Sequence, residues 1–212
     1  MLLQNTVTPW SNLIRERSRV ADLMGNRGVI HDGNREIKQK TWANKRWICC
    51  TKDFKGIDRR PLFRTDPFSY SELFFLDEAT AYAAGHRPCN DCRKGALLRF
   101  KQLWAQVLLP SDRVGSLTVD EIDAQLHHER INDGGGKATH PARQSSLPVG
   151  AMFVKDGDAY LIHRNGIRIW KPSGYMPAVA QPDSVVEVLT PRSIVQLLHN
   201  GLPVQIHPSA DA

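Results

Sequence analysis

The four cysteines of this chain constrain its fold more than any other feature. Cys49 and Cys50 are adjacent, and Cys89 and Cys92 follow in a Cys-x-x-Cys motif. The two-residue gap allows both thiolates of that motif to bind one tetrahedral metal ion, at metal–sulfur distances of ~2.3 Å. A helix is predicted directly after the motif, and the free N–H groups of its first turn favour thiolate over thiol. The pattern predicts a metal centre at the motif.

The compartment decides between a metal and disulfides. Residues 1–5 lack the basic start and apolar stretch of a secretion signal, and no apolar run approaches the ~20 residues of a membrane helix. We therefore expect a cytoplasmic protein with no membrane partner. Thiols stay reduced there, so the clustered cysteines favour bound Zn²⁺ over disulfide bonds.

The middle of the chain alternates strands and helices. Residues 47–51 and 71–76 are predicted as buried strands because they are rich in apolar and aromatic side chains. Asp77 is a typical N-cap for a helix over residues 78–84, and Gly85 is a typical helix stop. An amphipathic helix is predicted over residues 93–104.

The last third changes character. Thr118 and Glu121 form a capping box for a further helix, which extends to the polar segment at residues 127–130. A short helix is expected over residues 191–199. Strands separated by turn residues are predicted at 151–154, 159–162, 167–170 and 184–189, with a further strand expected at 202–206.

These elements predict an α+β protein, with a zinc module in the first half and a small antiparallel sheet with short helices in the C-terminal third. The chain has 212 residues and 41% hydrophobic content, which suffices for a substantial core. We expect residues 1–46 to form an N-terminal arm, with a short basic helix over 11–24. Residues 47–110 form the module, and residues 111–212 pack with it as one unit.

A resemblance to a known family adds to this interpretation. Residues 75–93 read FLDEATAYAAGHRPCNDCR, a strand followed by an alanine-rich helix, glycine, Arg-Pro and Cys-x-x-Cys. Residues 47–94 thus resemble the metal-binding domain of Ada-type DNA alkylation-repair proteins. In that family four cysteines hold zinc, and one of the upstream pair accepts a methyl group from a DNA phosphotriester. The resemblance implies a zinc site that includes Cys89 and Cys92 and a link to alkylation damage in DNA.

The upstream pair departs from the family pattern, which separates its first two ligands by three residues. Cys49 and Cys50 are adjacent, and on a strand their side chains point to opposite faces. If Cys49 matches the first ligand, Asp53 falls at the second position, where a carboxylate can bind zinc. If Cys50 matches, Phe54 falls there and cannot bind a metal. His86 is another candidate for the fourth ligand.

The departure leaves two roles for the metal. A structural zinc needs only ligation, whereas a methyl acceptor needs a nucleophilic thiolate among the upstream cysteines. The structural role is favoured, because closed four-ligand sites are usually structural.

Basic residues around the motif suggest a nucleic-acid partner, most simply DNA. The net charge is +6, and cations on both sides of the metal site suit phosphate contacts. These candidates are Arg59, Arg60, Arg64, Arg87, Arg93 and Lys94.

Two other functions compete with nucleic-acid binding. His127, Glu129 and Arg130 form a polar cluster in which Asp123 could orient the imidazole of His127 as a general base. That cluster would suit an enzyme acting on a nucleotide or nucleic acid, with zinc as a structural element. The remaining alternative is an interaction module without catalysis.

Overall fold

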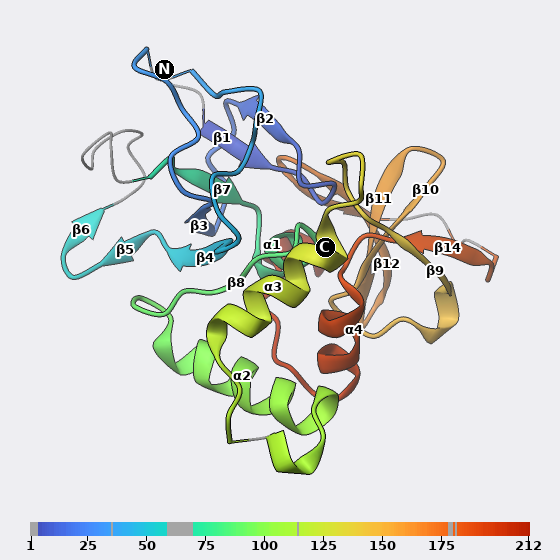
Figure 1. Cartoon of the computed structure of the whole chain (residues 1–212). Helices are drawn as coiled ribbons and strands as arrows, with labels where there is room; N and C mark the ends of the chain where they lie inside the picture. Colours follow the sequence, from blue (N-terminus) through green and yellow to red (C-terminus); the bar gives the residue numbers. More distant parts are fainter. Residues whose placement is uncertain (1–3, 35, 59–69, 114, 178–179, 181) are drawn as a thin grey trace.

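The computed structural model describes residues 4–34, 36–58, 70–113, 115–177, 180 and 182–212, with the side chains of residues 57 and 58 excepted. Within these residues the chain forms two six-stranded sheets, a small hairpin and four α-helices (Figure 1). The expected α+β class and the helices and sheet of the C-terminal third are confirmed.

The first sheet is mixed and is built from the N-terminal half. Its strands are β1 (Gln4–Val7), β2 (Leu13–Glu16), β3 (Leu23–Asn26), β4 (Ile48–Thr51), β7 (Leu73–Phe75) and β8 (Arg87–Pro88). Their order is β2-β1-β7-β3-β4-β8, with β1 parallel to β7 and β4 parallel to β8. A separate hairpin pairs β5 (Asp53–Phe54) with β6 (Ile57–Asp58).

The helix expected over residues 11–24 is wrong. That segment contains β2 and the start of β3, and β2 pairs with β1 along its whole length. The backbone pairing outweighs the weak helical pattern of this short basic segment. Just beyond β2, the Glu16 carboxylate accepts hydrogen bonds from the backbone N–H groups of Arg17 and Ser18. Residues 1–46, expected as an arm, thus supply three strands to the first sheet.

The second sheet is antiparallel throughout. Its strands are β9 (His140–Arg143), β10 (Met152–Lys155), β11 (Asp158–His163), β12 (Gly166–Lys171), β13 (Gly174–Pro177) and β14 (Val185–Val188), in the order β13-β12-β11-β10-β14-β9. The turn between β10 and β11 has positive φ at Asp156 and Gly157, as a two-residue hairpin requires. The strand expected at 202–206 is wrong. The backbone carbonyl of Gln205 instead accepts from the N–H of Glu78 at the start of a helix, and the Gln205 N–H donates to the Glu78 carboxylate.

Two of the four described α-helices, those that follow Asp77 and Thr118, begin where the capping residues predict. The four helices are α1 (Glu78–Ala83), α2 (Lys94–Leu108), α3 (Val119–Arg130) and α4 (Arg192–His199). The Asp77 carboxylate accepts from the backbone N–H of Thr80 at 2.8 Å, and Thr118 and Glu121 form both bonds of the capping box. Gly85 has φ +82°, and a Cβ there would lie 2.6 Å from the Arg130 side chain.

Helix α1 joins the two sheets. All six of its residues are buried. Ala79 and Ala83 pack in the core of the second sheet, whereas Ala81 and Ala84 pack in the core of the first. Small side chains are needed on both sides because the helix is enclosed between two packed layers. The alanine-rich run therefore fixes how the two halves meet.

Successive side chains of the second sheet point to opposite faces, and each face packs in a different hydrophobic core. Along β10, Met152 faces the core that contains α1, and Phe153 faces the core formed with α2, α3 and α4. Helix α4 packs on α2 and α3, and this group of helices lies beside the second sheet (Figure 1).

Candidate metal centre and its surroundings

Three thiols converge at the edge of the first sheet. The sulfur atoms of Cys50, Cys89 and Cys92 all lie within 4.8 Å of one another. Two thiolates of a tetrahedral zinc site lie about 3.8 Å apart, because each Zn–S bond is about 2.3 Å. Cys50 is 3% exposed and Cys89 7% exposed, while Cys92 is partly exposed. The cluster could therefore hold one metal ion with little movement.

Strand pairing positions these thiols. Cys50 lies on β4, and β8 runs parallel to it with Pro88 opposite Cys49. The backbone N–H of Cys89 donates to the carbonyl of Cys49 at 2.9 Å, which fixes the motif against β4. The N–H of Asp91 donates to the Cys89 sulfur at 3.4 Å, a contact that favours thiolate.

The three thiols strongly affect one another. Hydrogen bonds with Cys50 and Cys92 lower the pKa of Cys89. Hydrogen bonds with Cys89 and Cys92, together with burial, raise the pKa of Cys50. Three negative charges in one buried cluster repel, so they do not all ionise on their own. A divalent cation reverses this, because a coordinating thiol is deprotonated outright.

Cys49 lies on the opposite face of β4. Its sulfur is 3.6 Å from a guanidinium nitrogen of Arg93, which pairs with the buried carboxylate of Glu78. The Tyr82 hydroxyl donates to the same carboxylate at 3.0 Å. Burial raises the pKa of the Cys49 thiol well above its usual range. The alternation expected for adjacent cysteines on a strand is present, with Cys50 facing the cluster.

The other expected ligands also lie apart from the cluster. Asp53 is exposed on β5 and is not part of the thiol group. His86 is fully buried, accepts a hydrogen bond from Arg27 at 3.1 Å and contacts the rings of Trp47 and Phe75. Burial lowers the pKa of His86 well below its usual value, so its imidazole is a neutral core group.

Of the polar residues of α3, His127 and Arg130 lie together, whereas Glu129 contacts a different element. Arg130 is buried over the Trp47 ring and donates to the carbonyls of Gly85 and Lys45, each at 2.7 Å. His127 lies 3.3 Å from the same guanidinium. Glu129 instead accepts from the backbone N–H of Ser193 at 2.9 Å and from its hydroxyl at 2.6 Å. Arg130 and Glu129 thus tie α3 to neighbouring elements and diverge from each other.

The arginines next to the motif are engaged in buried ion pairs. Arg87 donates to both oxygens of Asp123, at 2.9 and 2.7 Å, and the two side chains are 2% and 3% exposed. Arg93 is held by Glu78. These guanidinium groups are not free to contact phosphates, whereas Lys94 is exposed at the start of α2. The expected contacts at Arg59, Arg60 and Arg64 lie outside the described residues.

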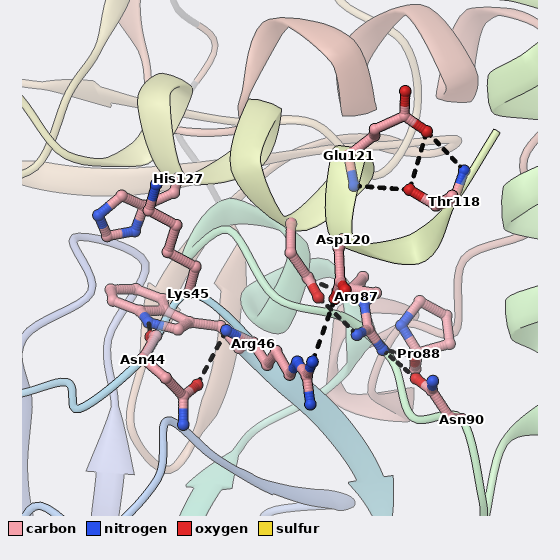
Figure 2. Close-up of polar contacts among 12 residues, drawn as sticks. Asn44, Lys45, Arg46, Arg87, Pro88, Asn90, Thr118, Asp120, Glu121 and His127 are labelled. Carbon is pink, nitrogen blue, oxygen red and sulfur yellow. Dashed lines mark hydrogen bonds and ion pairs between the residues drawn. The ribbon is translucent and has the colours of Figure 1, made fainter.

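A cleft of about 490 Å³ adjoins the thiol cluster, and Cys89 is part of its wall. Figure 2 shows Asn44, Arg46 and Asn90, which also line it. The cleft lies between β3, β4 and the start of α3, and three asparagines contribute amides to its lining: Asn26, Asn44 and Asn90. Arg46 and Asp120 form an exposed ion pair of 3.4 Å at its rim. The sequence analysis assigned no role to Asn44, Arg46 or Asp120, and Asn90 stood out only as part of the Cys-x-x-Cys motif.

Within the described ranges, no helix is long and apolar enough to cross a membrane. Comparison of the chain with models of protein families, with curated protein sequences and with solved structures found no match.

Proposed function

We propose that this chain is a zinc-binding protein that contacts nucleic acid, with the metal held by Cys50, Cys89 and Cys92. The convergence of three sulfur atoms from two separate segments carries the proposal. Thiolates are soft ligands that suit zinc, and structural zinc sites are rich in cysteine. The resemblance of residues 47–94 to the Ada-type metal-binding domain points to the same ion.

The metal has a structural role in this proposal. It links β4 to the segment that leads into α2, in a part of the chain where β8 has only two residues. Cys50 and Cys89 are almost completely buried, as expected of ligands that stabilise a fold. Cys50 now corresponds to the first ligand of the family pattern, which places Phe54 at the position of the second. The methyl-acceptor role is therefore the less favoured one.

Exposed cations around the centre support a nucleic-acid partner. Lys55, Arg46 and Lys94 are exposed, and the first two form long ion pairs with carboxylates, at 3.8 and 3.4 Å. Exposed pairs of this kind contribute little and exchange readily for phosphates. In this proposal the buried arginines stabilise the fold around the metal centre. The exposed cations bind the phosphates of the nucleic acid, which gives affinity but no sequence specificity.

Metal analysis of protein purified without added zinc tests the first half of the proposal. We expect one zinc per chain and loss of folded structure after chelation, because structural zinc contributes its binding free energy to folding. A metal-free chain with native structure and four reactive thiols would contradict a zinc centre.

Binding to a short DNA duplex at increasing salt tests the second half. We expect affinity to fall steeply, with a slope set by the phosphates that the protein neutralises. Lys94→Ala and Arg46→Ala should each reduce that slope by about 1, as should alanine at Arg59, Arg60 or Arg64. Arg164→Ala is the matched control, because Arg164 is exposed in the turn between β11 and β12.

Two results would contradict parts of the proposal. Binding that does not respond to salt would exclude phosphate contacts. A stoichiometric methyl adduct after incubation with DNA containing methyl phosphotriesters would replace the structural role of the metal with the acceptor role.

A further inference from the structure

A second hollow region lies at the helical end of the molecule, apart from the thiol cluster. One cavity of about 500 Å³ is formed by α2, α3 and α4, and another of about 330 Å³ lies between α3, α4 and the start of β9. The two cavities share Gln125, Glu129 and Arg192 in their walls. We call the combined space the helical cleft.

The first half of the helical cleft has an apolar floor. Its carbon-rich lining comes from Trp104, Leu108, Leu109 and Leu117. Trp104 and Leu117 are buried beneath it, each 3% exposed. This volume is large enough for an aliphatic chain or an aromatic ring.

The second half is polar and contains a buried histidine. His140 is 9% exposed, and within the described part of the chain its ring has no hydrogen-bond partner. The ring nitrogens of His140 are therefore available to a ligand in the cavity, one as a donor and the other as an acceptor. Burial and the nearby Arg192 lower the pKa of His140 to about 4, which keeps the ring neutral at neutral pH.

The two carboxylates that line the helical cleft already accept hydrogen bonds from other residues of the protein. Glu129 already accepts from Gln125 at 2.8 Å and from Ser193, and Glu121 is paired with Arg113 at 2.6 Å. The Arg192 guanidinium is exposed, and no described residue accepts a hydrogen bond from it. A planar guanidinium with free donors suits a carboxylate or phosphate.

We propose that the helical cleft binds a small amphipathic anion. Its hydrocarbon part lies over Trp104 and Leu108, and its carboxylate or phosphate head lies between Arg192 and His140. The site is separate from the metal centre and does not depend on nucleic-acid binding. A carboxylate and a phosphate monoester share the required chemistry, and titration with both distinguishes them.

Calorimetric titration of the 212-residue chain with octanoate, octyl phosphate and 1-octanol tests the proposal. We expect one equivalent of octanoate or octyl phosphate to bind, and 1-octanol to bind at least about tenfold more weakly, because charge-assisted hydrogen bonds are lost. The tighter of the two anions identifies the head group. Absence of binding by both anions at millimolar concentration would overturn the proposal, as would equal binding of octanol.

Two variants separate the two halves of the site. Arg192→Met should weaken binding of the anions about tenfold or more and leave octanol unchanged, because the aliphatic stem is kept. Leu108→Asn should weaken all three ligands. Arg164→Met is the charge-matched control and should change nothing. Thermal unfolding of each variant verifies folding, and unchanged anion affinity in folded Arg192→Met would overturn the assignment of the head-group position.

Discussion

Cys49 and Cys50 are neighbours in the sequence, yet they lie in two different chemical environments. The Cys50 face of β4 collects three thiols within 4.8 Å of one another and adjoins a polar cleft. The Cys49 face contains a single thiol beside the Arg93–Glu78 ion pair and the Tyr82 hydroxyl. In the part of the chain that the structure describes, the thiols on the Cys50 face therefore lack a neighbouring cation, whereas the Cys49 thiol already lies beside the guanidinium of Arg93.

The difference shows that the residue type alone does not make a ligand. A thiol becomes a metal ligand where other thiols converge on it and the cation that would stabilise them comes from outside the chain. Beside a guanidinium already held by a carboxylate, the same thiol is an ordinary buried group. Successive side chains on a strand point to opposite faces, so a shift of one residue along β4 decides which of these two environments a cysteine enters.

The largest expected difference between the faces is in metal affinity. Cys50→Ser should lower zinc affinity by more than about 100-fold, because loss of an outer partner of a ligand alone costs 10–100-fold. Cys49→Ser should retain one zinc per chain. Metal content after dialysis against a competing chelator measures both. Loss of zinc in folded Cys49→Ser together with retention in Cys50→Ser would reverse the assignment of the two faces.

The next effect concerns the ion pair on the Cys49 face. Arg93→Met leaves the Glu78 carboxylate buried at 5% side-chain exposure without its cation, which should cost about 3–5 kcal/mol in free energy of unfolding. Combining it with Glu78→Gln should recover part of that loss, because no charge is then left unpaired. Urea denaturation gives the values.

Arg113→Met is the control for this experiment. Its pair with Glu121 is 49% and 44% exposed, so its loss should cost no more than about 1 kcal/mol. Equal losses for Arg93→Met and Arg113→Met would show that the buried pair does not stabilise the Cys49 face.

The sequence predicts the local elements well and the long-range pairings poorly. The N-cap at Asp77, the stop at Gly85 and the capping box at Thr118 depend on nearby residues, and the structure has all three. In contrast, β1 pairs with β7 across a long stretch of chain, so nothing near residues 4–7 indicates that partner. Short strands of this kind are fixed by tertiary context.

The candidate site follows the same rule. The Cys-x-x-Cys motif is local, and its two sulfur atoms do converge. Whether Cys50 or Cys49 joins these two sulfur atoms depends on which face of β4 lies against the motif. That face is known only once the position of β4 in the sheet is known. Arg87 has the composition of a phosphate contact, but its partner Asp123 lies on α3, and only the fold brings that carboxylate to it.

The smallest effect isolates one hydrogen bond on the Cys49 face. Tyr82→Phe removes the hydroxyl that donates to Glu78 at 3.0 Å and should lower the free energy of unfolding by about 1.5–3 kcal/mol, because the acceptor is charged. Arg93 and the backbone N–H of Gln205 continue to contact the same carboxylate, which keeps the loss below that of Arg93→Met. Zinc affinity should stay unchanged, since the hydroxyl lies on the face of β4 away from Cys50. Urea denaturation and chelator competition on the same sample measure both quantities. A variant with native stability but weakened zinc binding would show that the two faces of β4 are coupled. It would contradict the independence of the Cys49 and Cys50 faces.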